Sequence, residues 1–211
     1  SISRSGRAEV RFQRQIGPKQ QSAHVVLGVK PLERGKGFQW LSQVAPPALP
    51  KLFIEAVKSS VQDSLLAGID LGYPVIDLQV MLEGGSFVEN ESTELAFKIA
   101  AAQALREALK GAGPVILEPM MSLEVVSPEE SMGTVIGDLS SRRGKILNLG
   151  NRHGMQVVKA DVPLASMFGY STVIRSFSQG RATFTMEFSH YESVPTQVAD
   201  EIKIKAGLLI K

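Results

Sequence analysis

Three histidines, His24, His153 and His190, are the side chains with the most direct potential for acid–base or metal chemistry. No two of them stand at a metal-ligand spacing, and the absence of cysteine excludes thiolate zinc sites, cysteine nucleophiles and disulfide bonds. The motifs GxSxG, HExxH and GxxxxGK[ST] are also absent from the sequence. The residues therefore indicate neither a hydrolase nor a nucleotide-binding loop.

A glycine-rich run, Gly84-Gly85-Ser86, precedes a predicted helix and so has the form of an anion-binding turn. Glu89, Asn90 and Glu91 follow it, and two carboxylates at the start of a helix would repel a phosphate. The run is better interpreted as a turn without a phosphate.

Basic residues gather at two places in the second half of the chain. Arg142, Arg143 and Lys145 surround the predicted end of one helix, and Arg175 and Arg181 bracket the end of the next. Such cations suit RNA phosphates, and they suit the last carbonyl groups of a helix equally well. If both helices lie on one face of a sheet, these arginines share an RNA-facing side. The spacing alone leaves both interpretations open.

The composition sets limits on any nucleic-acid contact. Of the 211 residues, 44% are hydrophobic and 21% charged, which is enough to form a core and gives no sign of disorder. Lys and Arg total 23 against 21 Asp and Glu, a net charge of +2, so such contacts must depend on local patches. No apolar run approaches the ~20 residues that span a bilayer, and no secretory signal is visible. We expect a soluble protein of a reducing compartment.

The elements that must position these residues follow from periodicity and breakers. Pro50 suits the first turn of a helix, and Ser92 or Thr93 can cap another. The first half is predicted to contain strands at 8–16, 24–29, 37–44 and 75–81, a turn at 84–86, and helices at 50–68 and 93–111.

The second half has a different order of elements. It is predicted to contain strands at 116–126, 145–150, 154–162 and 182–188, helices at 128–144 and 165–177, and a last helix from Thr196. The order strand-helix-strand-strand-helix-strand is the split βαβ, or ferredoxin-like, motif. Because Gly111-Ala112-Gly113-Pro114 separates the halves, we expect two α+β domains.

Several longer motifs in this order resemble the C-terminal part of translation elongation factor G. The resemblance runs from about Ala8 to Gly207. The matching segments are 66–68, 72–75, 92–98, 117–121, 127–130, 133–144, 163–170 and 180–188.

The resemblance implies a domain organisation. Residues 1–113 correspond to the family's fourth domain, which has a ribosomal protein S5-like fold, and 114–194 to its ferredoxin-like fifth domain. The C-terminal helix, within 195–211, is expected to pack back on the fourth domain.

The resemblance also implies a function. The family hydrolyses GTP on a separate N-terminal domain, moves tRNA and mRNA, and splits ribosomes together with a recycling factor. This chain is then expected to bind ribosomal RNA, ribosomal proteins of the factor-binding region, and tRNA–mRNA at the decoding site. We expect a cytoplasmic or organellar monomer without membrane contact, catalytic residues or cofactor, with GTP and Mg²⁺ on the missing domain.

This sequence departs from the family at the tip of the fourth domain, which consists of residues 16–23 and 85–90. The family's glycine-rich basic loop is replaced by a short segment, and the second loop lacks its histidine and brings acids that oppose phosphate. These departures favour a divergent paralogue, specialised for recycling or another ribosomal step. The tip residues expected to contact RNA are Pro18, Lys19, Gln20, Gly85, Ser86, Phe87, Val88, Glu89 and Asn90.

Two hypotheses from other classes remain open at the level of sequence. One is a ferredoxin-like regulatory module that binds a small ligand, and the other is a small-molecule enzyme of the S5-like superfold. The segments Ser141-Arg142-Arg143-Gly144 and Phe168-Gly169-Tyr170 favour the ribosome-binding hypothesis. A small-ligand site gives no reason for exposed arginines at a helix end.

Overall fold

The structure, a computed structural model, describes residues 1–16 and 19–208. The chain divides into two compact units, each with a four-stranded sheet. The first unit contains residues 1–116 and the segment from Pro195 onward, and the second contains Leu117–Val194.

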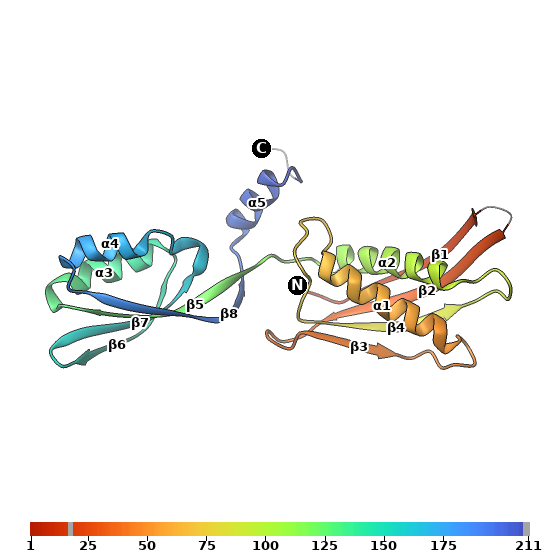
Figure 1. Ribbon diagram of the computed structural model, residues 1–211, viewed down its shortest axis with the longest axis horizontal. Coiled ribbons are helices and arrows are strands. Elements are labelled where there is room, and N and C mark those ends of the chain that lie inside the picture. The colour runs from red at the N-terminus through yellow and green to blue at the C-terminus, as the bar shows by residue number, and fades with distance from the viewer. Residues whose placement is uncertain (17–18, 209–211) are drawn as a thin grey trace. The chain divides into compact units, whose positions relative to one another are not determined.

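The first unit is an α+β layer structure (Figure 1). Its sheet has the order β1-β2-β4-β3, with β3 parallel to β4 and the other neighbours antiparallel. The two helices within residues 1–116 lie on one face of the sheet (Figure 1). The elements are β1 (Gly6–Ile16), β2 (Lys19–Pro31), β3 (Phe38–Ser42), α1 (Lys51–Ala67), β4 (Leu78–Ser86) and α2 (Glu94–Gly111).

Small residues bring α2 close to this sheet. Ala100, Ala104 and Ala108 recur at helical spacing and are fully buried. Opposite them, a Cβ atom on Gly6 of β1 would lie 2.2 Å from the Ala108 carbonyl oxygen, so only glycine fits there. At the other end, the Thr93 side chain caps α2 by accepting a hydrogen bond from Ala96 N at 3.1 Å.

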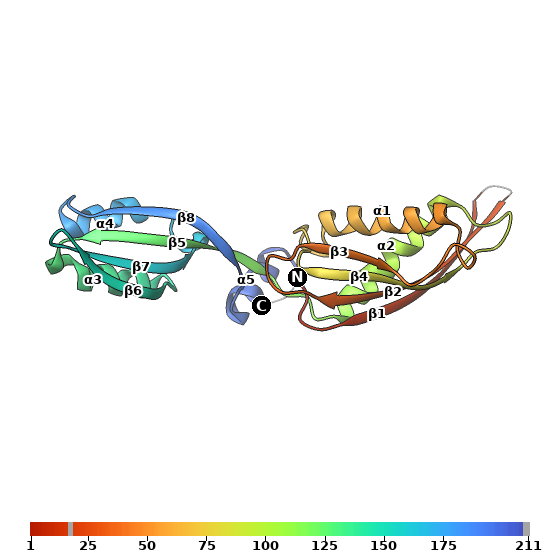
Figure 2. The same cartoon turned by 90° about the horizontal axis from the view of Figure 1, so that it is seen from below.

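The second unit has the order β6-β7-β5-β8 with all neighbours antiparallel, and β5 and β8 run side by side along it (Figure 2). This is the predicted ferredoxin-like arrangement. The elements are β5 (Leu117–Ser127), α3 (Glu129–Ser141), β6 (Lys145–Arg152), β7 (Met155–Pro163), the 3₁₀ helix η1 (Leu164–Ser166), α4 (Tyr170–Ser178) and β8 (Thr183–Ser193).

The predicted fold class, an S5-like domain followed by a ferredoxin-like domain, is confirmed. Helix α5 (Thr196–Lys205) follows β8, and none of its side chains, all of which the structure describes, is buried. The expected return of this helix onto the fourth domain stays a prediction. No helix within the described residues has the length and apolar character needed to cross a membrane.

One strand prediction and one helix prediction were wrong, each for a local backbone reason. The fourth strand was expected at 75–81, but β4 starts at Leu78 because the buried Asp77 has a left-handed backbone, with φ of 59°. The helix expected at 165–177 is divided into η1 and α4, because Gly169 has φ of 74° and interrupts the helical path.

Candidate functional site

The described parts of the tip lie side by side at one end of the first unit, at the right in Figure 1. The β1–β2 hairpin stays paired as far as Ile16 and Lys19. Ser22 of the hairpin forms a bridge with Ser92 of the β4–α2 loop, and its backbone N–H donates to the Glu91 carbonyl at 3.2 Å. The Thr93 hydroxyl adds a hydrogen bond to the Gln21 side chain at 3.1 Å. The fold therefore joins the two tip segments that the sequence separates.

Internal hydrogen bonds order the second tip segment. The Val88 N–H donates to the Ser92 hydroxyl, and Ser92 N–H donates to the Val88 carbonyl, both at 2.9 Å. The Asn90 backbone is left-handed, with φ of 67°, which asparagine tolerates better than most residues. Phe87 is 40% exposed although its ring lies near that of Phe53, with centroids 6.0 Å apart, and Glu89 is exposed as well.

The expected turn at 84–86 is wrong, because β4 continues through Gly84 and Gly85 to Ser86. Gly85 allows β2 and β4 to approach each other closely, because a Cβ atom at this position would lie 2.9 Å from the His24 carbonyl oxygen of β2. Of the other tip residues, Pro18 lies outside the described residues, Lys19 begins β2, and Gln20 is exposed on it. Phe87, Val88, Glu89 and Asn90 do form the loop after β4.

A hydrogen-bonded cluster that the sequence analysis missed lies next to the tip. His24 of β2 contacts Glu9 of β1 through Nε2 at 2.9 Å and Ser86 of β4 through Nδ1 at 3.0 Å. The His24 hydrogen bond is the main cause that lowers the pKa of the Glu9 carboxyl. The three residues are far apart in the sequence, so only strand register brings them together. They link three strands across the open face of the sheet.

In the second unit, Arg142 is held inside the structure. Its Nε donates to Asp138 at 2.7 Å, its Nη1 donates to the Ser166 carbonyl at 2.6 Å, and its guanidinium lies 5.2 Å from the Tyr170 ring centroid. Only 16% of its side chain is exposed. The side chain thus ties the end of α3 to η1.

Arg143 makes a second tie. Its two terminal nitrogens donate to the two carboxylate oxygens of Glu118, each at 2.7 Å, in a bidentate pair that joins the end of α3 to β5. The Glu118 side chain is only 11% exposed. These hydrogen bonds are the main cause that raises the pKa of the Arg143 guanidinium. The sequence interpretation had placed such cations on helix carbonyls or on RNA, not on acids.

The basic residues of this unit do not form one cluster. The Ser131 hydroxyl near the start of α3 donates to the Phe177 carbonyl near the end of α4, so the two helices run in opposite directions. Arg181 pairs with Glu130 at the start of α3. Arg181 therefore lies at the opposite end of α3 from Arg142, about 20 Å away along the helix. Arg175 lies within α4, five residues or about 8 Å of helix beyond the Tyr170 that Arg142 contacts. Arg142 and Arg181 therefore do not share one cluster, and the expectation that the arginines of this unit share an RNA-facing side stays a prediction.

Lys145 and Arg175 differ from the other three cations. Both are exposed, and neither has an ion-pair partner within residues 1–16 and 19–208. They keep their charge available to a binding partner. Arg142, Arg143 and Arg181 would have to exchange existing contacts for new ones.

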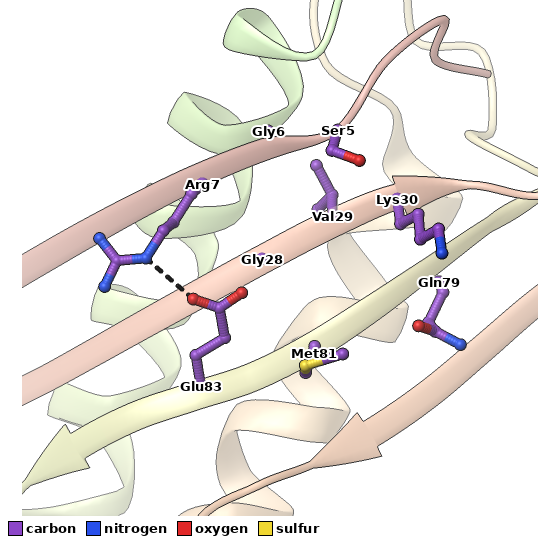
Figure 3. A pocket seen from close by; sticks show the side chains of 9 residues that line it. All are labelled: Ser5, Gly6, Arg7, Gly28, Val29, Lys30, Gln79, Met81 and Glu83. Carbon is purple, nitrogen blue, oxygen red and sulfur yellow. Dashed lines mark hydrogen bonds and ion pairs between the residues drawn. The ribbon is translucent and has the colours of Figure 1, made fainter.

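A shallow groove of about 340 Å³ lies on the open face of the first sheet (Figure 3). The Glu83 side chain lies over Gly28 in this groove, and its carboxylate accepts a hydrogen bond from Arg7 Nε at 2.8 Å. A Cβ on Gly28 would lie 2.2 Å from Glu83 Oε1, so the glycine makes room for this pair. The charged lining residues are Arg7 and Lys30 and the carboxylate of Glu83, which is already paired with Arg7. The lining residues are Ser5, Gly6, Arg7, Gly28, Val29, Lys30, Gln79, Met81 and Glu83.

Comparison with protein-family models identifies both units. The model described as "Elongation factor G, domain IV" matches residues 1–113, and the model "Elongation factor G C-terminus" matches residues 115–202. Together with the two folds, these matches define a fragment of a translation elongation factor. The chain belongs to the elongation factor G family. The matched models are its fourth and C-terminal domains, neither of which is the GTPase domain.

A solved structure supports the same assignment. The chain is similar to a crystal structure of a protein from Thermus thermophilus, with 32% sequence identity and a TM-score of 0.85. The match covers 99% of this chain and 31% of that one. The chain therefore spans about a third of the length of that structure.

Proposed function

We propose that this chain is the ribosome-binding part of an elongation factor G-like translational GTPase that acts in tRNA–mRNA translocation. The observation that carries the proposal is the tandem match of both family domains over residues 1–113 and 115–202. The partners are ribosomal RNA, ribosomal proteins of the factor-binding region, and tRNA–mRNA at the decoding site. GTP and Mg²⁺ bind a separate domain of the longer protein, so this chain has no catalytic role. The protein works as a cytoplasmic monomer.

The geometry of the tip supports a contact at the decoding site. The β1–β2 hairpin and the β4–α2 loop form one surface, joined through Ser22 and Ser92. Loops held side by side by a rigid sheet can be inserted together into a binding site. The second unit contributes the exposed cations Lys145 and Arg175, which suit RNA phosphates.

The charge of the tip favours a second candidate function, ribosome recycling or another specialised step. Glu89 is exposed and Glu91 is half-buried in the loop after β4. Acids at a phosphate-lined site raise the barrier for any step that the tip contacts assist. Under this second candidate function, the longer protein binds ribosomes but moves tRNA and mRNA slowly. A glycine-rich basic loop grafted between Ile16 and Ala23 should then restore part of the translocation rate.

Co-sedimentation tests the proposal directly. The 211-residue chain should pellet with ribosomes at low salt and less so at moderate salt, because phosphate contacts release counterions. The same purified chain should show no GTP turnover, since it has no phosphate-cradling loop. Failure to pellet at low salt would contradict ribosome binding. Measurable GTP turnover would contradict the assignment of hydrolysis to a separate domain.

A further inference from the structure

Phe168 is the most exposed large apolar side chain in the described part of the chain. It is 83% exposed, between η1 and α4 in the second unit. Its neighbours Met167 and Tyr170 are only 6% and 2% exposed. The segment is therefore anchored in the core on both sides of Phe168, and its exposure does not come from poor packing of the segment.

The backbone around Phe168 is fixed by short-range contacts. The Met167 N–H donates to the Leu164 carbonyl at 3.0 Å, and the Tyr170 N–H donates to the Met167 carbonyl at 3.1 Å. Gly169 supplies the left-handed turn that other residues disfavour. Arg142 holds the preceding carbonyl, that of Ser166. A ring presented on such a segment loses little conformational freedom when it binds a partner.

The surroundings of Phe168 favour a flat, charged partner over a protein. The neighbouring exposed residues, Ala165, Gly169, Ser171 and Thr172, are small, so a planar group can approach the ring. An anchor for a protein partner is expected within a larger apolar patch. Here the Arg142 guanidinium donates to the Ser166 carbonyl two residues before Phe168, and Lys145 follows α3 at the same end of the unit.

We propose that Phe168 stacks on an unpaired nucleobase of ribosomal RNA, with Lys145, the exposed cation at the same end of the unit, beside an adjoining phosphate. Aromatic rings next to positive charge are the usual means by which proteins bind unpaired bases. The proposal rests on the proposed ribosome binding and specifies one contact within it. Because stacking needs a π face, the identity of the side chain at position 168 decides the outcome.

Three variants of the full 211-residue chain separate stacking from simple apolar contact. Phe168→Ala should weaken ribosome binding by roughly tenfold or more, the usual effect of losing one stacked base. Phe168→Leu keeps apolar volume without the π face and should bind as weakly as Phe168→Ala. Phe168→Tyr should bind like the original chain. The matched control is Phe188→Ala, which removes a 56% exposed ring from β8 and should leave binding unchanged.

The measurement is the dissociation constant for ribosomes, together with chemical probing of base accessibility in the bound ribosomal RNA. One unpaired base should be protected by the original chain and by Phe168→Tyr but not by Phe168→Leu. Normal binding by Phe168→Leu would overturn the stacking proposal and indicate an apolar protein contact. Equal binding of the original chain and Phe168→Ala would overturn it and leave the proposed function intact. If the original chain does not bind ribosomes at all, both proposals fail.

Discussion

The tip of the first unit and the arginine end of the second unit, consisting of Arg142, Arg143 and their partners, use polar groups in opposite ways. At the tip, backbone and hydroxyl groups hold the loops, and the carboxylate of Glu89 is left exposed. At the arginine end, the guanidinium groups hold the structure through Asp138 and Glu118. A cluster of charge in a sequence therefore does not show which charges a partner can use.

Each region also contains one buried hydroxyl without a hydrogen-bond partner among the described residues. These are Ser22 at the tip and Tyr170 beneath Arg142. An unpaired buried hydroxyl costs about 1–3 kcal/mol. Both regions thus give up stability, which is a recurrent feature of functional surfaces.

The largest effect is expected from removing the carboxylate that holds Arg143. Glu118→Ala should lower the free energy of unfolding by about 2–3 kcal/mol, because it leaves a partly buried guanidinium without its bidentate partner. Chemical denaturation of the single and double variants with Arg143→Ala measures the coupling. If the losses of unfolding free energy in the two single variants simply add, Glu118 and Arg143 are not coupled, and their ion pair does not stabilise the arginine end.

The next effect is a change of stability with pH at Tyr170. Burial raises the pKa of this hydroxyl to about 12, with the Asp138 carboxylate adding to the rise and Arg142 opposing it. The unfolded chain loses the proton near pH 10, so the unfolded state binds fewer protons above that pH and stability falls. The loss should be about 1.4 kcal/mol per pH unit between pH 10 and 12.

Tyr170→Phe provides the control for this pH dependence. The phenylalanine variant should be at least as stable as the original chain at neutral pH, because it removes an unpaired buried hydroxyl. Above pH 10 the variant should lose less stability than the original chain, as measured by urea unfolding at each pH. Parallel curves for the two proteins would show that the hydroxyl titrates normally in the folded state.

A smaller effect should distinguish the available cations from the structural ones. Lys145→Ala should reduce the log–log salt dependence of ribosome binding by about one unit, if its exposed ammonium contacts one phosphate. Between 50 and 200 mM salt this corresponds to roughly a three- to fourfold smaller loss of affinity. Arg143→Ala is the matched comparison, with a loss of stability and little change of slope. The reverse pattern would show that Lys145 is not the RNA contact.

The sequence predicted the elements well wherever periodicity or caps dominate the local energy. The strands of the second unit and helix α2 with its Thr93 cap were confirmed, because burial alternates along the strands and recurs at helical spacing in α2. The ion pair between Asp138 and Arg142 is also predictable from the sequence, because an acid and a base four residues apart on a helix lie next to each other.

Other features depend on contacts between distant segments and were therefore missed. Glu118 meets Arg143, 25 residues later, only because α3 returns the chain to β5. The cluster of Glu9, His24 and Ser86 depends on the register of three strands. Gly85 was taken for a turn residue because the sequence does not show that a neighbouring strand approaches it closely.

The smallest predicted effect concerns the acids of the tip. The double change of Glu89→Gln and Glu91→Gln should raise ribosome affinity about twofold at low salt, and the gain should vanish at high salt because exposed charges are screened. Glu107→Gln is the matched control, since this exposed acid lies near the opposite end of α2 and should not alter binding. In the longer protein, the double change should also speed tRNA–mRNA translocation, because it removes charge that opposes phosphates at the decoding site. An equal gain from Glu107→Gln would attribute the effect to net charge alone. A gain in affinity without a gain in translocation rate would instead favour the recycling role, since the tip would then bind the ribosome without assisting movement.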